Sequence, residues 1–152
     1  MSNFIQNDLF FGVFGKDEYL TLNKRNEIDK DNLVLISIHD PDQKIHSLTD
    51  VQGFDDVLQI QFWDLEESIA NYEIITSEQG QEIREFILKN KNKRFLVHCA
   101  AGISRSAGVA CAIECLVDFD GINYNYKTSN SDVKSHWRYS PNWTVYDKII
   151  EG

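Results

Sequence analysis

The sequence is poor in features that would mark a disordered or segmented protein. Proline occurs only twice in 152 residues, and no proline-rich, glycine-rich or low-complexity tract divides the chain. Aromatic residues make up 12% of it, more than disordered segments usually contain. We therefore expect residues 1–152 to form a single domain without a linker, since this length is usual for one hydrophobic core.

Cysteines and long apolar runs are also scarce. The three cysteines are an odd number, and Cys111 and Cys115 lie four residues apart in an apolar, helix-like run. This pattern argues against a secreted disulfide framework, so we expect both to pack in the core as small apolar side chains. No apolar run approaches the roughly 18 residues that span a membrane, and residues 1–16 lack a basic segment followed by an apolar one. We expect a cytoplasmic protein with no membrane partner.

Positive charge is the third scarce feature. Fifteen basic residues stand against 24 acidic ones, which gives a net charge of −9. Such a field repels nucleic-acid backbones at long range, and we expect no nucleic-acid partner. A small anion can still bind where local donors overcome the overall field. A phosphate site therefore remains compatible with the composition.

The histidines show no metal-binding pattern. His39, His46 and His136 are widely spaced and lack the short His-x-x-x-His or cysteine-pair spacings that define metal sites. We expect them to be surface or turn residues, and we expect no metal and no cofactor.

Strands and helices are predicted to alternate. Helix signals lie at Thr76–Gln79, which matches a capping box and predicts a helix ending near Asn90, and at Ser104–Asp118, where almost every residue is small or apolar. The polar segment Asp120–Asn142 is predicted to be a loop. Three short apolar runs predict strands: Leu33–Ile38, Val57–Phe62 and Arg94–His98. The first and the last are nearly continuous, as strands buried on both faces are. This order predicts an α/β fold with a central, mostly parallel sheet flanked by helices.

One segment combines the elements of a reactive anion site. Cys99 ends a predicted strand, and Arg105 enters the following helix six residues later. The unpaired N–H groups and positive end of that helix, with Gly102 allowing the chain to curl, predict a loop of donors around phosphate oxygens. The same field favours the nucleophilic thiolate of Cys99, and the guanidinium of Arg105 can clamp two phosphate oxygens. The predicted phosphate-binding residues are Ala100, Ala101, Gly102, Ile103, Ser104 and Arg105.

The residues His-Cys, five residues and then Arg-Ser resemble the signature loop of the protein tyrosine phosphatase superfamily. The string Ala-Gly-x-Ser-Arg-Ser is similar to its dual-specificity branch. The resemblance implies a dual-specificity phosphatase-like fold and a metal-independent reaction through a phosphocysteine on Cys99. It also implies that His98 supports the loop and the thiolate through hydrogen bonds. The hydroxyl of Ser106 would help the thiolate to leave.

The resemblance further implies a general acid on a loop that follows another strand. Asp64, directly after the strand predicted at Val57–Phe62, is the candidate, and Asp42 in the Asp-Pro-Asp turn is the alternative. Trp63 could cover the substrate or belong to the core. Asn142 could brace the loop, as an asparagine near that point does in relatives, or could be an ordinary turn residue.

The function predicted from these residues is hydrolysis of phosphotyrosine in a phosphoprotein, with phosphoserine and phosphothreonine as further candidates. One alternative is a phosphate-binding regulatory module with little turnover. Another is a phosphatase for a non-protein phosphate ester, although lipid-directed relatives add basic residues within the loop, where this chain has Ala100, Ala101 and Ile103. The natural substrate and the oligomeric state stay open.

Overall fold

The computed structural model describes residues 4–118 and 131–152. The strands of these residues are β1 (Phe10–Gly15), β2 (Leu33–His39), β3 (Asp56–Gln61) and β4 (Arg94–Cys99). The helices are α1 (Lys16–Lys24), α2 (Leu48–Val51), α3 (Ser77–Lys89), α4 (Arg105–Ile113), which continues as the π-helix η1 (Glu114–Asp118), α5 (Asp132–Ser135) and α6 (Trp143–Glu151). None of these helices is long and apolar enough to cross a membrane.

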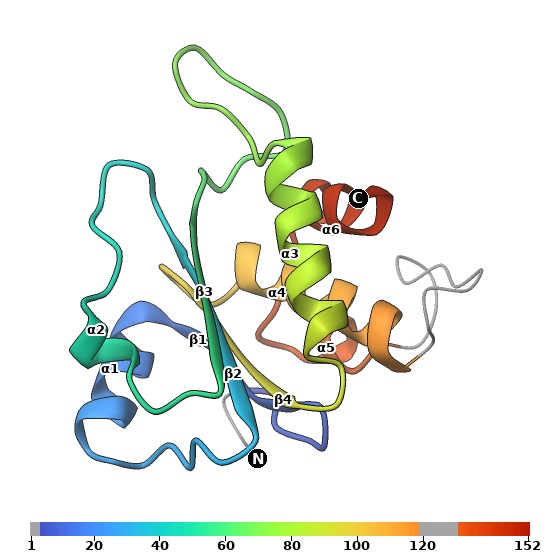
Figure 1. Ribbon diagram of the computed structural model, residues 1–152. Helices are drawn as coiled ribbons and strands as arrows, with labels where there is room; N and C mark the ends of the chain where they lie inside the picture. The colour runs from blue at the N-terminus through green and yellow to red at the C-terminus, as the bar shows by residue number, and fades with distance from the viewer. Residues whose placement is uncertain (1–3, 119–130) are drawn as a thin grey trace.

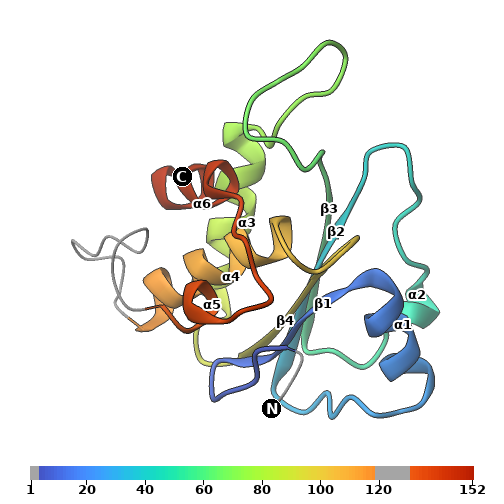
Figure 2. The same ribbon diagram turned by 180° about the vertical axis from the view of Figure 1, so that it is seen from behind.

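The strands form one parallel sheet in the order β1-β4-β2-β3. Helices α1 and α2 lie on one face, and α3, α4 and α6 cover the other (Figures 1 and 2). Every residue of β2 is buried, because this central strand is covered on both sides. The larger core lies between the sheet and α3, α4 and α6, whereas the smaller one packs Tyr19 of α1 against Leu35 and Leu96.

The predicted α/β class and the three predicted strands are confirmed, each to within one residue at either end. The capping box is confirmed as well: Thr76 Oγ1 accepts from Gln79 N at 3.0 Å, and Gln79 Oε1 accepts from Thr76 N at 3.0 Å. Cys111 and Cys115 are buried in the larger core, as predicted. Strand β1 and helices α1, α2 and α6 were not predicted.

Two predictions along the second half of the chain need correction. The helix predicted over Ser104–Asp118 begins at Arg105 and is regular only to Ile113, after which it widens into a π-helix. The loop predicted over Asp120–Asn142 is wrong at Asp132–Ser135, which form α5 because the Ser131 side chain caps the turn by accepting from Lys134 N. Residues 119–130 lie outside the described residues.

Helix α6 is held closely against α3. Gly80 is the contact point, since a Cβ atom at this position would overlap the backbone carbonyl of Lys148. At the other end of the contact, Arg84 Nη1 donates to the carbonyl of Ile150 at 2.7 Å and to that of Ile149 at 3.3 Å. These carbonyls belong to the last turn of α6, where a cation is favourable. The contact fixes α6, whose N-terminus lies at the site described below.

We expect Gly80→Ala to lower the free energy of unfolding by about 1–3 kcal/mol, the usual cost of overfilling a packed contact. An ordinary Gly→Ala change inside a helix would instead stabilise it by about 1 kcal/mol. Urea unfolding measures the difference, with Glu82→Ala on the exposed face of α3 as the control, expected within about 0.5 kcal/mol of wild type. A more stable Gly80→Ala protein would contradict the close packing of α3 and α6.

Candidate active site

The predicted site residues come together at one edge of the sheet. Parallel strands end at the same edge, and here β4 ends at Cys99 beside Gly15, the last residue of β1. The loop at residues 100–104 then returns towards β1, where Lys16 N donates to Ala100 O at 3.1 Å. Gly102 has a φ of +73°, and a Cβ atom there would overlap the backbone at Gly15. Only glycine can lie this close to Gly15, and this agrees with the prediction that Gly102 allows the loop to curl.

The sulfur of Cys99 is almost enclosed, with 2% of the residue exposed. Gly102 N donates to Sγ at 3.2 Å, and the Cys99 thiol and the Ser106 hydroxyl are hydrogen-bonded at 3.1 Å. Ser106 lies in the first turn of α4, so the sulfur faces the positive end of a helix. The loop and the start of α4 therefore both contact the sulfur, through Gly102 N and the Ser106 side chain.

Arg105 is buried, with 3% exposed, and its guanidinium is already engaged. Nη1 donates to Phe62 O at 2.7 Å and lies 2.7 Å from Asp40 Oδ1. Its Nε is buried without a hydrogen-bond partner among the described residues. The contact with Asp40 was not predicted, because nothing in the local sequence relates the two residues.

The structure places Asp64 against the loop. Asp64 Oδ1 accepts from Ser104 Oγ at 2.8 Å and from Asn142 Nδ2 at 3.0 Å. Asp42 is exposed in the turn after β2. Of these two candidate acids, Asp64 is the one that contacts the loop in the described part of the chain.

Asn142 has both of the roles that the sequence left open. As the N-cap of α6, its Oδ1 accepts from Thr144 N and Val145 N, each at 3.1 Å. It also bridges the site, because its backbone N donates to Ser104 O at 3.0 Å while its Nδ2 donates to Asp64 and to Leu65 O. Asn142 therefore joins the loop after β3 to the start of α4.

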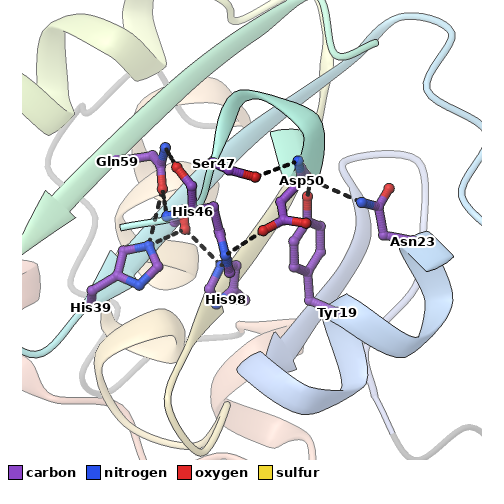
Figure 3. Close-up of polar contacts among 9 residues, drawn as sticks. Tyr19, Asn23, His39, His46, Ser47, Asp50, Gln59 and His98 are labelled. Carbon is purple, nitrogen blue, oxygen red and sulfur yellow. Dashed lines mark hydrogen bonds and ion pairs between the residues drawn. The ribbon is translucent and has the colours of Figure 1, made fainter. Parts of the chain in front are cut away.

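His98 lies behind Cys99, within a group of buried histidines (Figure 3). Its Nε2 is 2.7 Å from Ser37 Oγ and 2.9 Å from His46 Nε2, and its Nδ1 is 3.4 Å from Cys99 O. In the described residues its hydrogen bonds thus reach the backbone of Cys99 and not the sulfur. The ring stacks on Tyr19, with centroids 4.9 Å apart.

The prediction that His39 and His46 are surface or turn residues is wrong. They are 2% and 8% exposed, because His39 ends the buried strand β2 and the His46 ring packs against Tyr19 and His98. Burial lowers the pKa of His98 to about 3, that of His46 to about 4, and that of His39 below its ordinary 6.5. The rings of His46 and His98 are therefore uncharged at neutral pH. His136 is half-buried in a bend after α5.

A pocket of about 380 Å³ opens beside Arg105. One wall is aromatic, since the rings of Trp63 and Tyr72 meet edge to face with centroids 4.9 Å apart. The guanidinium of Arg105 and the carboxylates of Asp40 and Asp64 also line the pocket. The lining residues are Asp40, Trp63, Asp64, Leu65, Ile69, Tyr72 and Arg105.

An ion pair that was not predicted, between Glu18 and Arg138, contacts the loop at Gly102. Arg138 Nε donates to Gly102 O at 3.2 Å, and its Nη1 donates to Glu18 Oε2 at 3.0 Å. Glu18 Oε1 in turn accepts from Gly15 N at 2.8 Å. The two side chains come from positions 120 residues apart, so no local pattern could indicate the pair.

The comparisons with known proteins give structural matches only. No family model matches the sequence, and no curated protein matches it. The Cydia pomonella PTP-2 phosphatase matches with a TM-score of 0.65 at 16% identity, over 97% of this chain and 88% of that one. DUSP15 matches with a TM-score of 0.58 at 23% identity, over 92% and 80%. The human tyrosine phosphatase-like serine/threonine/tyrosine-interacting protein matches with 0.56 at 18% identity, over 94% and 86%. The chain thus has the fold of the small dual-specificity phosphatases, as predicted.

We expect Glu18→Gln to lower the free energy of unfolding at neutral pH by no more than about 1 kcal/mol, because this ion pair is partly exposed. The hydrogen bond from Arg138 lowers the pKa of Glu18 below its ordinary 4.5. The stabilisation is therefore present above pH 4.5 and is lost as the pH falls through the lowered pKa. Urea unfolding at several pH values should show the gap to wild type closing in acid, whereas a gap that widened in acid would contradict the pairing. Glu27→Gln, at an exposed position, is the control.

Proposed function

We propose that the protein is a cysteine-dependent phosphatase that hydrolyses phosphotyrosine in phosphoproteins, with phosphoserine and phosphothreonine as further substrates. The observation that carries this proposal is the gathering of the Cys99 sulfur, Arg105 and Asp64 around a single loop of backbone N–H groups. The fold shared with the dual-specificity phosphatases supports it.

The loop supplies the phosphate site in this proposal. The backbone N–H groups of residues 100–105 and the start of α4 bind the phosphate oxygens, since such donors and the helix end favour an anion. Arg105 adds two parallel hydrogen bonds and neutralises charge as the transition state develops. Its buried Nε, which lacks a partner among the described residues, is a donor that a phosphate oxygen would satisfy.

The reaction then proceeds in two displacements. The Cys99 thiolate attacks phosphorus, the bond from phosphorus to the ester oxygen breaks, and Asp64 gives its proton to that oxygen. Asp64 next takes a proton from water, which attacks phosphorus and breaks the bond to sulfur, and the Ser106 hydroxyl stabilises the thiolate that leaves. Because Asp64 Oδ1 is held by Ser104 and Asn142, its Oδ2 is the oxygen available for the proton.

The aromatic wall favours an aryl phosphate. Trp63 and Tyr72 line the pocket beside Arg105, where the ring of a phosphotyrosine could lie against them. Tyr72 and Ile69 are themselves exposed, which leaves the rim open. An open rim is compatible with smaller phosphorylated side chains as well.

A phosphate-binding module with little turnover is the second candidate. The observation that favours it is the contact of Arg105 with Asp40, since the carboxylate competes with phosphate for the guanidinium. Phosphopeptide binding without phosphate release by the wild-type protein would support this alternative over catalysis.

We expect wild-type protein to release phosphate from a phosphotyrosine peptide without added metal, and Cys99→Ser to release none. Asp64→Asn should slow release about 10²- to 10⁴-fold while inorganic phosphate still binds, because general-acid help contributes this much to the rate and little to binding. Asp42→Asn is the matched control and should retain wild-type activity. Full activity in Cys99→Ser would overturn the proposal, and a slow Asp42→Asn with an unaffected Asp64→Asn would reverse the choice of acid.

We expect Arg105→Lys to reduce kcat/KM for the same peptide by at least about 10²-fold, the usual loss when a transition-state donor is removed. Lysine keeps the positive charge but cannot provide the planar pair of hydrogen bonds. Steady-state kinetics test this, with Lys134→Arg, a basic residue of α5 outside the pocket, as the control. Near-normal turnover in Arg105→Lys would show that charge alone suffices.

A further inference from the structure

We propose that His39, His46 and His98 form a buried binding site for one divalent transition-metal ion, with zinc as the ion that such a site favours. The ligand atoms of the three side chains all lie within 4.8 Å of one another. They come from three separate segments: the end of β2, the residue before the N-cap of α2, and the second-last residue of β4 (Figure 3). This inference does not depend on the proposed function.

The first argument is the number of partners around single nitrogen atoms. An imidazole nitrogen offers one proton or one lone pair. Yet His98 Nε2 faces both Ser37 Oγ at 2.7 Å and His46 Nε2 at 2.9 Å, and His39 Nε2 faces both Ser37 Oγ at 2.7 Å and Gln59 Oε1 at 3.1 Å. Each of these two nitrogens would have to share its single proton or lone pair between two partners. One cation between the nitrogens would take a lone pair from each of them.

The second argument is the spacing of the nitrogens. Zinc binds histidine nitrogen at about 2.0–2.1 Å in a tetrahedron, which places two such nitrogens about 3.3 Å apart. The 2.9 Å separation of His46 Nε2 and His98 Nε2 and the 4.8 Å limit for the whole group lie on either side of this value. Side-chain shifts within about an ångström would bring the three into a metal-binding arrangement. The Ser37 hydroxyl is the nearest oxygen for a fourth position.

The third argument is that a carboxylate and a carbonyl already lie on the outer side of two of the rings. Metal-binding histidines usually direct the other ring nitrogen at a carboxylate or a carbonyl. His46 Nδ1 lies 3.9 Å from Asp50 Oδ2, and His98 Nδ1 lies 3.4 Å from Cys99 O. The backbone of Asp50 is fixed as well, because its carbonyl accepts from Tyr19 Oη at 2.6 Å and from Asn23 Nδ2 at 2.9 Å.

His46 is fixed although it lies outside the strands. Gln59 of β3 accepts from His46 N at 2.8 Å and donates to His46 O at 3.1 Å, so its amide pairs with both backbone groups. This pairing holds His46 where its ring contacts that of His98. A site assembled in this way costs little further ordering when an ion binds.

The chemistry of the donors selects the class of ion. Neutral imidazoles suit zinc and its neighbours among the transition metals, whereas magnesium and calcium prefer oxygen ligands. The three rings are buried, and among the described residues His98 contacts the backbone carbonyl of Cys99 and not its sulfur. We therefore assign the ion the role of tying β2, β4 and the segment at His46 together, with no part in the displacement at phosphorus.

The test uses the full chain, purified and freed of metal with a chelator, then titrated with Zn²⁺ and with Co²⁺. We expect one zinc per chain by elemental analysis, a higher Tm with zinc, and Co²⁺ absorption in the visible range without the near-ultraviolet band of a thiolate ligand. His46→Phe, which keeps a ring of similar size, should bind at least 100-fold more weakly. His136→Phe, the matched change at a histidine outside the group, should bind as wild type does.

Cys99→Ser distinguishes this site from adventitious binding at the reactive cysteine and should keep its zinc. Wild-type protein that takes up no stoichiometric ion would overturn the proposal. So would equal binding by His46→Phe, or loss of zinc in Cys99→Ser. Because the wild-type titrations are decisive by themselves, poor folding of a variant would not leave the proposal unanswered, and none of these readouts uses phosphatase activity.

Discussion

The close approach of Gly102 to the end of β1 determines where the sulfur of Cys99 and the groups that contact it lie. Parallel pairing places Gly15 beside Cys99, and the loop that follows Cys99 turns back onto this same point with Gly102 at a φ of +73°. No other residue type fits there, since a Cβ atom would overlap the backbone of β1. Arg138 holds the Gly102 carbonyl from the solvent side. The loop is thus fixed to the sheet, and in the proposed function its N–H groups would bind phosphate without reorganisation.

The rest of the site depends on strands that run in one direction. Because β2 and β3 end at the same edge as β4, the residues following them meet the start of α4 without long connections. Asp64 accepts from Ser104 and Asn142 and so joins the end of β3, the start of α4 and the cap of α6. Arg105 is held between Asp40 and the carbonyl of Phe62. Its buried charge is therefore compensated by Asp40, and in the proposed function a phosphate would share the guanidinium with this carboxylate.

What the sequence could predict was local. The capping box at Thr76–Gln79, the buried strands and the Cys99-to-Arg105 spacing each lie within a few consecutive residues, and the fold they predict is the fold observed. β1 was not predicted, because Gly12 interrupts its short apolar run and Gly15 ends it. The histidine group could not be predicted, since His46 and His98 are 52 residues apart and meet only when parallel pairing and Gln59 bring their segments together. The ion pair between Glu18 and Arg138 escaped for the same reason.

The central claim is that Cys99 carries the phosphoryl group between the two displacements. The most direct measurement is rapid acid quenching of Asp64→Asn during turnover of an aryl phosphate with a good leaving group, followed by mass spectrometry of the digested protein. The first step then needs little acid help, while hydrolysis of the intermediate is slowed, so phosphocysteine should accumulate. The account predicts one phosphoryl group on the peptide that contains Cys99. Phosphate release with an unmodified Cys99, or a phosphoryl group on another residue, would contradict it.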